Sequence, residues 1–169
     1  MTDADQTLDP NSPHRHGSFA GQTGVVTGGS QGLGNAVARL MKARGAANIL
    51  LVGRDQAKGD AAAAAIDGDG CSVSFVSADL ADTGGAELVV DTVDERYGTV
   101  HAVASCAAAT WRGTVWNTTE SMWDAMLALN VRLPGLLVSA CAQRMKNAGV
   151  DGSMVLISSI AHHLSLIHI

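Results

Sequence analysis

Several residue types are scarce in this sequence, and each scarcity argues against a class of protein. The three cysteines are an odd number without a C-x-x-C spacing, which argues against a disulfide framework or a zinc site and for a reducing compartment. No apolar run approaches the ~20 residues that a membrane-spanning helix needs. Basic residues number 11 against 16 acidic ones, so no basic surface is offered to nucleic acid. We therefore expect a cytoplasmic protein with no nucleic-acid and no membrane partner.

The N-terminal segment lacks the basic start and apolar stretch of a signal peptide. We expect residues 1–17 to form a disordered tail and residues 18–163 to form one domain. In that domain, apolar runs of strand length alternate with helical segments. The expected strands are 24–26, 49–52, 73–76, 100–104 and 154–157. The alternation predicts an α/β fold, a Rossmann-type doubly wound parallel sheet with three αβα layers that ends after the fifth strand.

The expected helices follow the strands in turn. The first would bury one face that carries Leu33, Val37, Leu40 and Met41. Two others are expected over 56–66 and 83–97. The last begins after Thr118 or Thr119 and continues to about residue 147, with a kink at Pro134.

A glycine-rich turn follows the first expected strand, with the sequence Thr27-Gly28-Gly29-Ser30-Gln31-Gly32-Leu33-Gly34. Glycines let the chain turn tightly and let backbone amides approach a pyrophosphate at the N-terminus of the next helix. Because the turn lies between the first strand and the first helix, dinucleotide binding is favoured over a merely structural turn. The expected cofactor-binding residues of this turn are Gly28, Ser30, Gln31, Gly32, Leu33 and Gly34.

This turn resembles the T-G-x-x-x-G-x-G cofactor signature of short-chain dehydrogenases/reductases, and three later segments resemble that family in the same order. Asp79-Leu80 resembles the segment that contacts the adenine. Asn130 and Ser159 resemble the asparagine and serine of the catalytic tetrad. The resemblance implies hydride transfer between a nicotinamide cofactor and a small carbonyl or alcohol substrate, by a parent protein that forms homo-oligomers.

One departure from the family pattern is clear. The family's Asn-Asn-Ala-Gly after the fourth strand is replaced by Ser105-Cys106-Ala107-Ala108. Small side chains still let the backbone lie close to a cofactor, but the asparagine hydrogen bonds are lost. We expect Cys106 to remain a cofactor contact.

The end of the second strand indicates the choice of cofactor. NAD-using relatives carry an acidic residue there, whereas this chain has Gly53 followed by Arg54. A guanidinium can bind a 2′-phosphate with two charge-assisted hydrogen bonds, so NADP(H) is preferred over NAD(H).

Each residue also has a plainer interpretation. Asp79 could be a turn residue, Asn130 an exposed helix residue, Ser159 a strand-end serine and Arg54 a solvated loop residue. Two alternatives stay open, a non-catalytic dinucleotide-binding module and an NAD-using dehydrogenase. The presence of Asn130 and Ser159 speaks against the first, and the Gly53-Arg54 pair against the second.

The resemblance further implies a tyrosine about a dozen residues after the serine, with a lysine four residues beyond it, for the acid/base work. The single tyrosine, Tyr97, has His101 four residues on, so the chain as written is expected to be inactive. Residues 164–169 resemble the translated end of a transposon adapter used in preparing sequencing libraries. We expect them to be non-native and the native sequence to be interrupted near His163.

We predict that the uninterrupted gene encodes Tyr-x-x-x-Lys shortly after Ser159. Sequencing the source locus across the codon for His163 measures this directly. Genuine sequence that continues through residues 164–169 and then lacks such a pair would refute the prediction.

Overall fold

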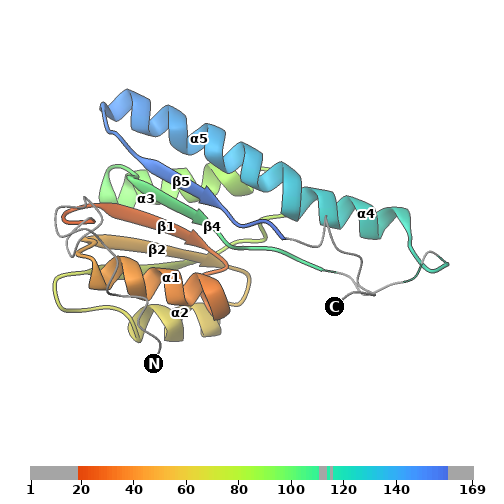
Figure 1. The fold of residues 1–169 in the computed structure, drawn as a ribbon, viewed down its shortest axis with the longest axis horizontal. Helices are drawn as coiled ribbons and strands as arrows, with labels where there is room; N and C mark the ends of the chain where they lie inside the picture. The colour runs from red at the N-terminus through yellow and green to blue at the C-terminus, as the bar shows by residue number, and fades with distance from the viewer. Residues whose placement is uncertain (1–18, 111–113, 115, 160–169) are drawn as a thin grey trace, which may run out of the picture.

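One parallel sheet organises the chain. The computed structural model describes residues 19–110, 114 and 116–159. Within them the sheet has the strand order β3-β2-β1-β4-β5. Its strands are β1 (Thr23–Thr27), β2 (Asn48–Gly53), β3 (Ser72–Ser77), β4 (Ala102–Ser105) and β5 (Ser153–Leu156). Every pairing is parallel, so the predicted Rossmann-type sheet is confirmed (Figure 1).

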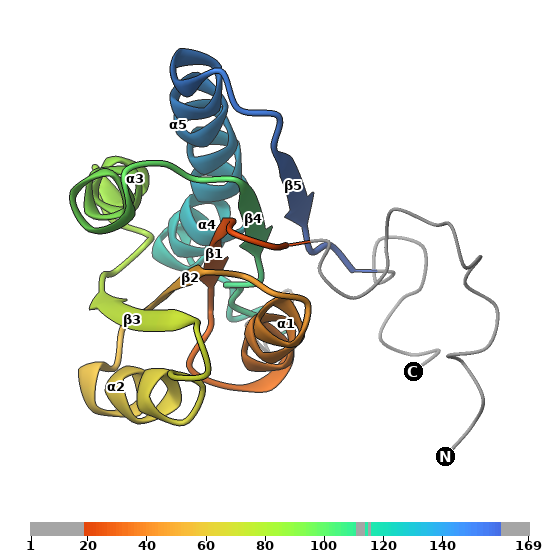
Figure 2. The same cartoon turned by 90° about the vertical axis from the view of Figure 1, so that its left-hand side faces the viewer.

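Helices cover both faces of this sheet. Helices α1 (Gly32–Ala43) and α2 (Gln56–Ala64) lie on one face, and α3 (Gly85–Tyr97) and α5 (Leu133–Ala148) lie on the other (Figures 1 and 2). Successive residues of a strand point to opposite faces. Val25 and Leu50 therefore join the core under α3 and α5, while Val26 and Leu51 join the core under α1 and α2. Burial on both faces explains why the inner strands are continuous apolar runs.

The direction of chain travel across the sheet reverses beside β1. The chain runs outward from β1 to β2 and β3, then crosses to β4, which pairs with the other edge of β1. Val25 lies opposite both Leu50 and Val103, so β1 is the central strand. The carboxyl ends of β1 and β4 thus form a topological switch point, which is where open α/β sheets bind ligands.

The predicted buried face of α1 is wrong in part. Leu33 and Leu40 are 56% and 53% exposed, whereas Met41 is buried as predicted and Val37 packs against the core. The helix also buries Gly34 and Ala38, and their small size lets α1 lie close to the sheet and the glycine turn. Apolar periodicity misidentified the face because it gave more weight to large side chains than to close backbone approach.

The last helical region contains a wide turn that the sequence did not predict. Helix α4 (Glu120–Leu127) is capped by Thr119, whose hydroxyl accepts a hydrogen bond from the Met122 amide at 3.3 Å. A π-helical turn, η1 (Ala128–Arg132), then joins it to α5. The irregularity was expected at Pro134 but lies in the preceding turn. Proline has no N–H to donate to the carbonyl four residues earlier, and its ring crowds that carbonyl, so the turn before it widens.

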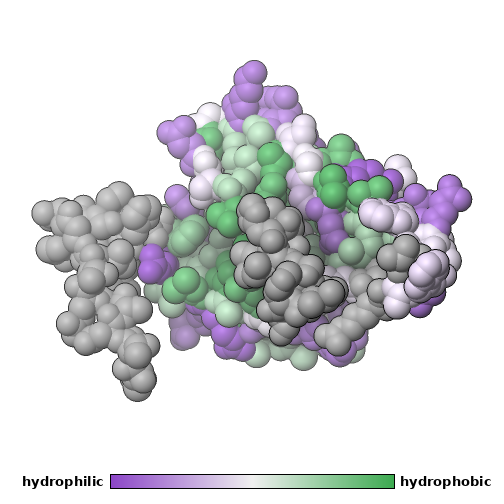
Figure 3. Space-filling view, turned by 45° about the vertical axis from the view of Figure 1, so that its right-hand side comes forward, coloured by the Kyte–Doolittle hydropathy of each residue, from purple (hydrophilic) through white to green (hydrophobic). Residues whose placement is uncertain are grey.

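The β5 side of the molecule carries exposed apolar residues. Val155, Leu156 and Ile157 are about half exposed, as are several side chains of α4, η1 and α5. Figure 3 shows apolar surface on this side between hydrophilic margins. The helical stretch Glu120–Ala148 is long and apolar enough to cross a membrane by length and composition alone. A helix packed on a core passes the same test, and α5 buries Leu137 and Cys141 against the sheet.

Two helical glycines provide a matched test of the packing. A Cβ at Gly59 in α2 would lie 2.2 Å from two carbons of the Phe75 ring, whereas one at Gly135 in α5 would meet nothing within 4 Å. We predict that Gly59→Ala lowers the free energy of unfolding by about 1–3 kcal/mol, because overpacking outweighs the gain in helix propensity. Gly135→Ala should instead raise it by up to about 1 kcal/mol.

Urea unfolding of the three proteins, followed by circular dichroism, measures both changes. An equal response to the two substitutions would contradict the close packing of α2 on Phe75.

Candidate functional site

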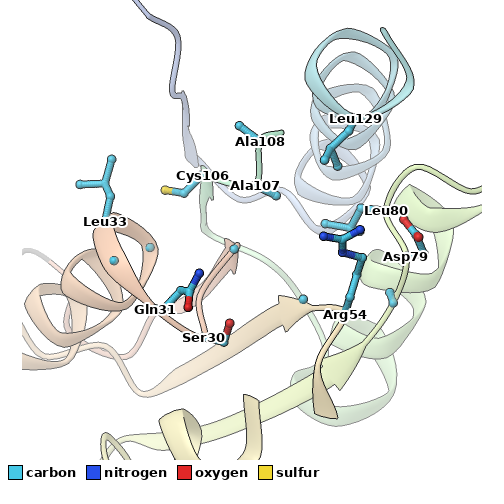
Figure 4. A pocket seen from close by; sticks show the side chains of 15 residues that line it. Ser30, Gln31, Leu33, Arg54, Asp79, Leu80, Cys106, Ala107, Ala108 and Leu129 are labelled. Carbon is cyan, nitrogen blue, oxygen red and sulfur yellow. The ribbon is translucent and has the colours of Figure 1, made fainter. Parts of the chain in front are cut away.

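A cleft of about 300 Å³ lies over the switch point at the carboxyl ends of the strands. Ten of the twelve predicted site residues line it (Figure 4). They come from the glycine turn, the end of β2 and the loops after β3 and β4. These residues are Gly28, Ser30, Gln31, Gly32, Leu33, Gly34, Arg54, Asp79, Leu80 and Cys106.

The glycine turn depends on the absence of side chains at two positions. Gly28 has a φ of +68°, and a Cβ there would lie 3.0 Å from the Ala107 nitrogen. A Cβ at Gly34 would lie 2.4 Å from the Gly28 carbonyl oxygen. Both obstacles are backbone atoms, which cannot rotate aside. The two glycines therefore let three backbone segments touch, namely the turn at Gly28, the start of α1 and the loop after β4.

The N-terminus of α1 points into this cradle without a side-chain cap. Its N-cap residue is Gln31, whose side chain makes no capping hydrogen bond. The first N–H groups of a helix have no partner inside the helix, and they carry the positive end of its dipole. An uncapped helix start behind a glycine turn is suited to a phosphate or pyrophosphate.

A buried hydroxyl ties the turn to the loop after β4. Thr27 is fully buried, and its Oγ1 accepts the N–H groups of Cys106 and Ala107, both at 3.1 Å. The same hydroxyl donates to Ser105 Oγ at 3.5 Å. One donor and two acceptor positions are thereby used, which is all that a threonine hydroxyl offers.

The opposite wall is formed by the ends of β2 and β3. Arg54 projects toward Leu80 and Leu129 in Figure 4. The Ser77 hydroxyl donates to the Arg54 carbonyl at 3.0 Å and so fixes its backbone. No salt bridge found among the described residues involves the Arg54 guanidinium. Asp79 Oδ1 accepts the Ala81 amide at 3.0 Å, which closes a short turn around the buried Leu80.

The two predicted catalytic residues lie outside the lining of the cleft. Asn130, within η1, accepts the Ala109 amide at 3.0 Å and donates to the Ala109 carbonyl at 2.8 Å. The Asn130 side chain thus binds the backbone of the loop after β4 through two hydrogen bonds. Ser159 is exposed, three residues beyond the end of β5. Tyr97 is at the end of α3 and donates to Ser74 at 2.7 Å, so its hydroxyl is engaged away from the cleft.

Cys106 has the least buried thiol of the three cysteines. It is partly exposed at the cleft, whereas Cys71 and Cys141 are buried. Burial raises the pKa of all three thiols above the usual value, and it raises the pKa of Cys141 to about 12.

Five lining residues were not among the predicted site residues. Gly53, Ala107 and Ala108 belong to segments that the sequence had already singled out, so their place was available from the motif positions. Leu129 and Ala78 also line the cleft, and each directly precedes a predicted site residue, Asn130 and Asp79 respectively. Thr27 and Ser105 gave no separate signal, because their role is a hydrogen bond between segments 78 residues apart.

The sheet order and the glycine-rich turn at the start of α1 define a Rossmann-type α/β protein. Residues 22–169 match the family described as short chain dehydrogenase. The chain belongs to this family, as the sequence motifs predicted.

Several relatives and solved structures are similar to this chain. It is 34% identical over 148 residues to human dehydrogenase/reductase SDR family member 2, mitochondrial, covering 87% of the chain and 52% of that protein. It is 33% identical over 140 residues to the NADP-dependent (R)-specific alcohol dehydrogenase of Lentilactobacillus kefiri, covering 83% and 55%. The chain therefore spans about half the length of these curated relatives.

The solved structures agree with this assignment. A metagenomic short-chain oxidoreductase in complex with NADP has a TM-score of 0.78 at 32% identity, covering 85% of this chain and 65% of that one. The L-sorbose reductase from Gluconobacter frateurii, complexed with NADPH and L-sorbose, has a TM-score of 0.76 at 25% identity. That match covers 82% of this chain and 53% of the reductase.

We predict that alkylation distinguishes the three cysteines. Iodoacetamide should modify Cys106 first, slowly near neutral pH and faster as pH rises above 9, because the thiolate is the nucleophile and the pKa is raised. Cys71 and Cys141 should react only on unfolding. Peptide mass spectrometry after timed labelling measures each site. Modification of Cys141 at a rate equal to that of Cys106 would contradict the buried position of Cys141.

Proposed function

We propose that this chain forms the cofactor-binding part of an NADP(H)-dependent oxidoreductase acting on a carbonyl/alcohol pair. The observation that carries the proposal is the convergence of ten predicted site residues on one cleft at the switch point. A bound nicotinamide cofactor would supply the hydride chemistry. This chain's residues would bind the cofactor and hold the walls of the site.

The glycine turn and the start of α1 would hold the pyrophosphate. The cradle that Cβ atoms at Gly28 or Gly34 would fill supports this assignment, as does the uncapped N-terminus of α1. Backbone amides would donate to the phosphate oxygens, and the helix dipole would favour their negative charge.

Arg54 would select the phosphorylated cofactor. It lines the cleft beside Gly53, where a side-chain carboxylate is absent, and its backbone is anchored by Ser77. A 2′-phosphate next to the guanidinium would gain a charge-assisted contact instead of meeting repulsion. The NADP-dependent relative and the NADP- and NADPH-bound structures support this choice of cofactor.

Asn130 and Ser159 would serve the reacting end of the site. By resemblance, Ser159 would hydrogen-bond the substrate oxygen and Asn130 would maintain a proton relay. The grip of Asn130 on Ala109 indicates a part of this role that the chain performs itself, which is to fix the loop after β4 beside the cofactor. The tyrosine and lysine expected for the acid/base step have no counterpart at that spacing in this sequence.

We predict that the 169-residue chain binds NADPH more tightly than NADH and that Arg54→Asp removes the preference. The substitution deletes the partner of the phosphate and adds repulsion, for an expected loss of at least ~1.5–3 kcal/mol in NADPH binding. That loss is a factor of roughly 10 to 150 in the dissociation constant. Titration calorimetry or cofactor fluorescence with both cofactors measures it.

Lys146→Asp is the matched control, because it makes the same change of charge near the end of α5. It should leave the ratio of the two dissociation constants unchanged. Unaltered discrimination in Arg54→Asp would show that Arg54 is not the selector. Absence of binding by either cofactor to the unmodified chain would refute the proposed function.

A further inference from the structure

The π turn η1 contacts both sides of the cleft. Leu129 lines the cleft itself, and Asn130 grips the backbone of Ala109 in the loop after β4. Arg132, two residues further on, donates from its guanidinium to the carbonyl of Ala81, in the loop after β3. Residues two apart on a helix point in different directions, so one turn reaches two separate loops.

Those two loops are far apart in the sheet. Strands β2 and β1 lie between β3 and β4, so three strand spacings of about 4.8 Å each separate the loop origins, roughly 14 Å in all. The Ala109 side is close to the glycine turn, and the Ala81 side carries Asp79 and Leu80. The η1 turn therefore bridges the cleft from one wall to the other.

The loop after β3 is packed at Leu80 and exposed beyond it. Leu80 is buried in the core under α3 and α5, and a Cβ at Gly85 in α3 would lie 3.3 Å from the Leu80 Cα. Ala81 is half-buried and residues 82–84 are exposed. A second pocket of about 290 Å³ opens beside this part of the loop, lined by the start of α3 and by Arg132, Leu133 and Leu136. Because residues 81–84 bury little surface, their position depends more on their hydrogen bonds.

Two of those hydrogen bonds fix the short turn, and they have different effects. Asp79 accepts the Ala81 amide, which closes the turn but does not tie it to the rest of the fold. Arg132 ties the Ala81 carbonyl to a helix that is itself packed on the sheet through Leu133 and Leu137. No salt bridge found in the described part of the chain involves Arg132.

We propose that Arg132 is a positioning residue for the adenine end of the cofactor site. It does not line the cleft, and it acts by holding the Asp79-Leu80-Ala81 wall at the distance that the adenine and its ribose require. The inference rests on the proposed function. It adds a residue that matches none of the family motifs in the sequence and touches no part of the cofactor. Because both nicotinamide cofactors share the adenine, both should depend on Arg132 equally.

The test measures dissociation constants of NADPH and NADH for the 169-residue chain and for Arg132→Met. Both constants should rise by roughly tenfold, which corresponds to ~1.4 kcal/mol, while their ratio stays unchanged. Arg132→Lys keeps the charge and a donor and should restore most of the affinity. Lys146→Met, which removes one exposed positive charge elsewhere, should bind like the unmodified chain.

Hydrogen exchange supplies a readout that needs no cofactor. In Arg132→Met, amides of residues 81–84 should exchange faster, while those of β1 and β4 keep their protection. A changed NADPH/NADH ratio would mean that Arg132 acts on the phosphate directly, and it would overturn the proposal. Faster exchange with unaltered affinity for both cofactors would overturn it as well. Failure of the unmodified chain to bind either cofactor would instead refute the proposed function, and this inference with it.

Discussion

The cleft depends on the contact between the end of β1 and the start of the loop after β4. These segments lie close together for two reasons. The buried Thr27 hydroxyl accepts hydrogen bonds from two backbone amides of that loop, and Gly28 has no side chain that would collide with Ala107. The Cys106 amide also donates to the Thr27 carbonyl at 3.2 Å, so it is the Ala107 amide that relies on the hydroxyl. A buried amide without a partner costs about 1–3 kcal/mol, so this hydrogen bond removes a cost that would otherwise oppose the approach. The strand order sets the switch point, and this contact sets the shape of the glycine turn and of the cleft above it.

The departure from the family pattern after β4 makes sense at this contact. Ser105 and Cys106 stand where the family pattern has two asparagines, and the buried Ser105 Oγ accepts a hydrogen bond from the Thr27 hydroxyl. The amide-bearing side chains are lost, but the small replacements keep the backbone close to Thr27 and leave the thiol of Cys106 at the cleft. Relative to the family pattern, this wall of the cleft therefore carries fewer hydrogen-bonding side-chain groups.

The sequence predicted what local rules decide. Alternating apolar runs predicted the parallel sheet, and the glycine turn predicted where the lining residues gather, although their roles stay predictions. The buried face of α1 was predicted correctly at Met41 and wrongly at Leu33 and Leu40. Gly34 and Ala38 pack closely because they are small, which apolar periodicity underrates. The π turn was missed because the irregularity was expected at Pro134 itself rather than in the turn before it. The Arg132 contact was missed because it joins residues 51 positions apart, and no local pattern contains that information.

The residues proposed to bind the cofactor and the groups needed for proton transfer do not lie together in this chain. The residues suited to phosphates and to an adenosine line one cleft, and their geometry relies on backbone atoms and buried hydroxyls. A carbonyl that accepts a hydride also needs a proton, and the one tyrosine of the chain donates to Ser74 at the far end of α3. The dissociation constant of the cofactor, rather than a rate of turnover, therefore tests the proposed roles of these residues. The proposed turnover would need a proton donor that the described residues do not bring to the cleft.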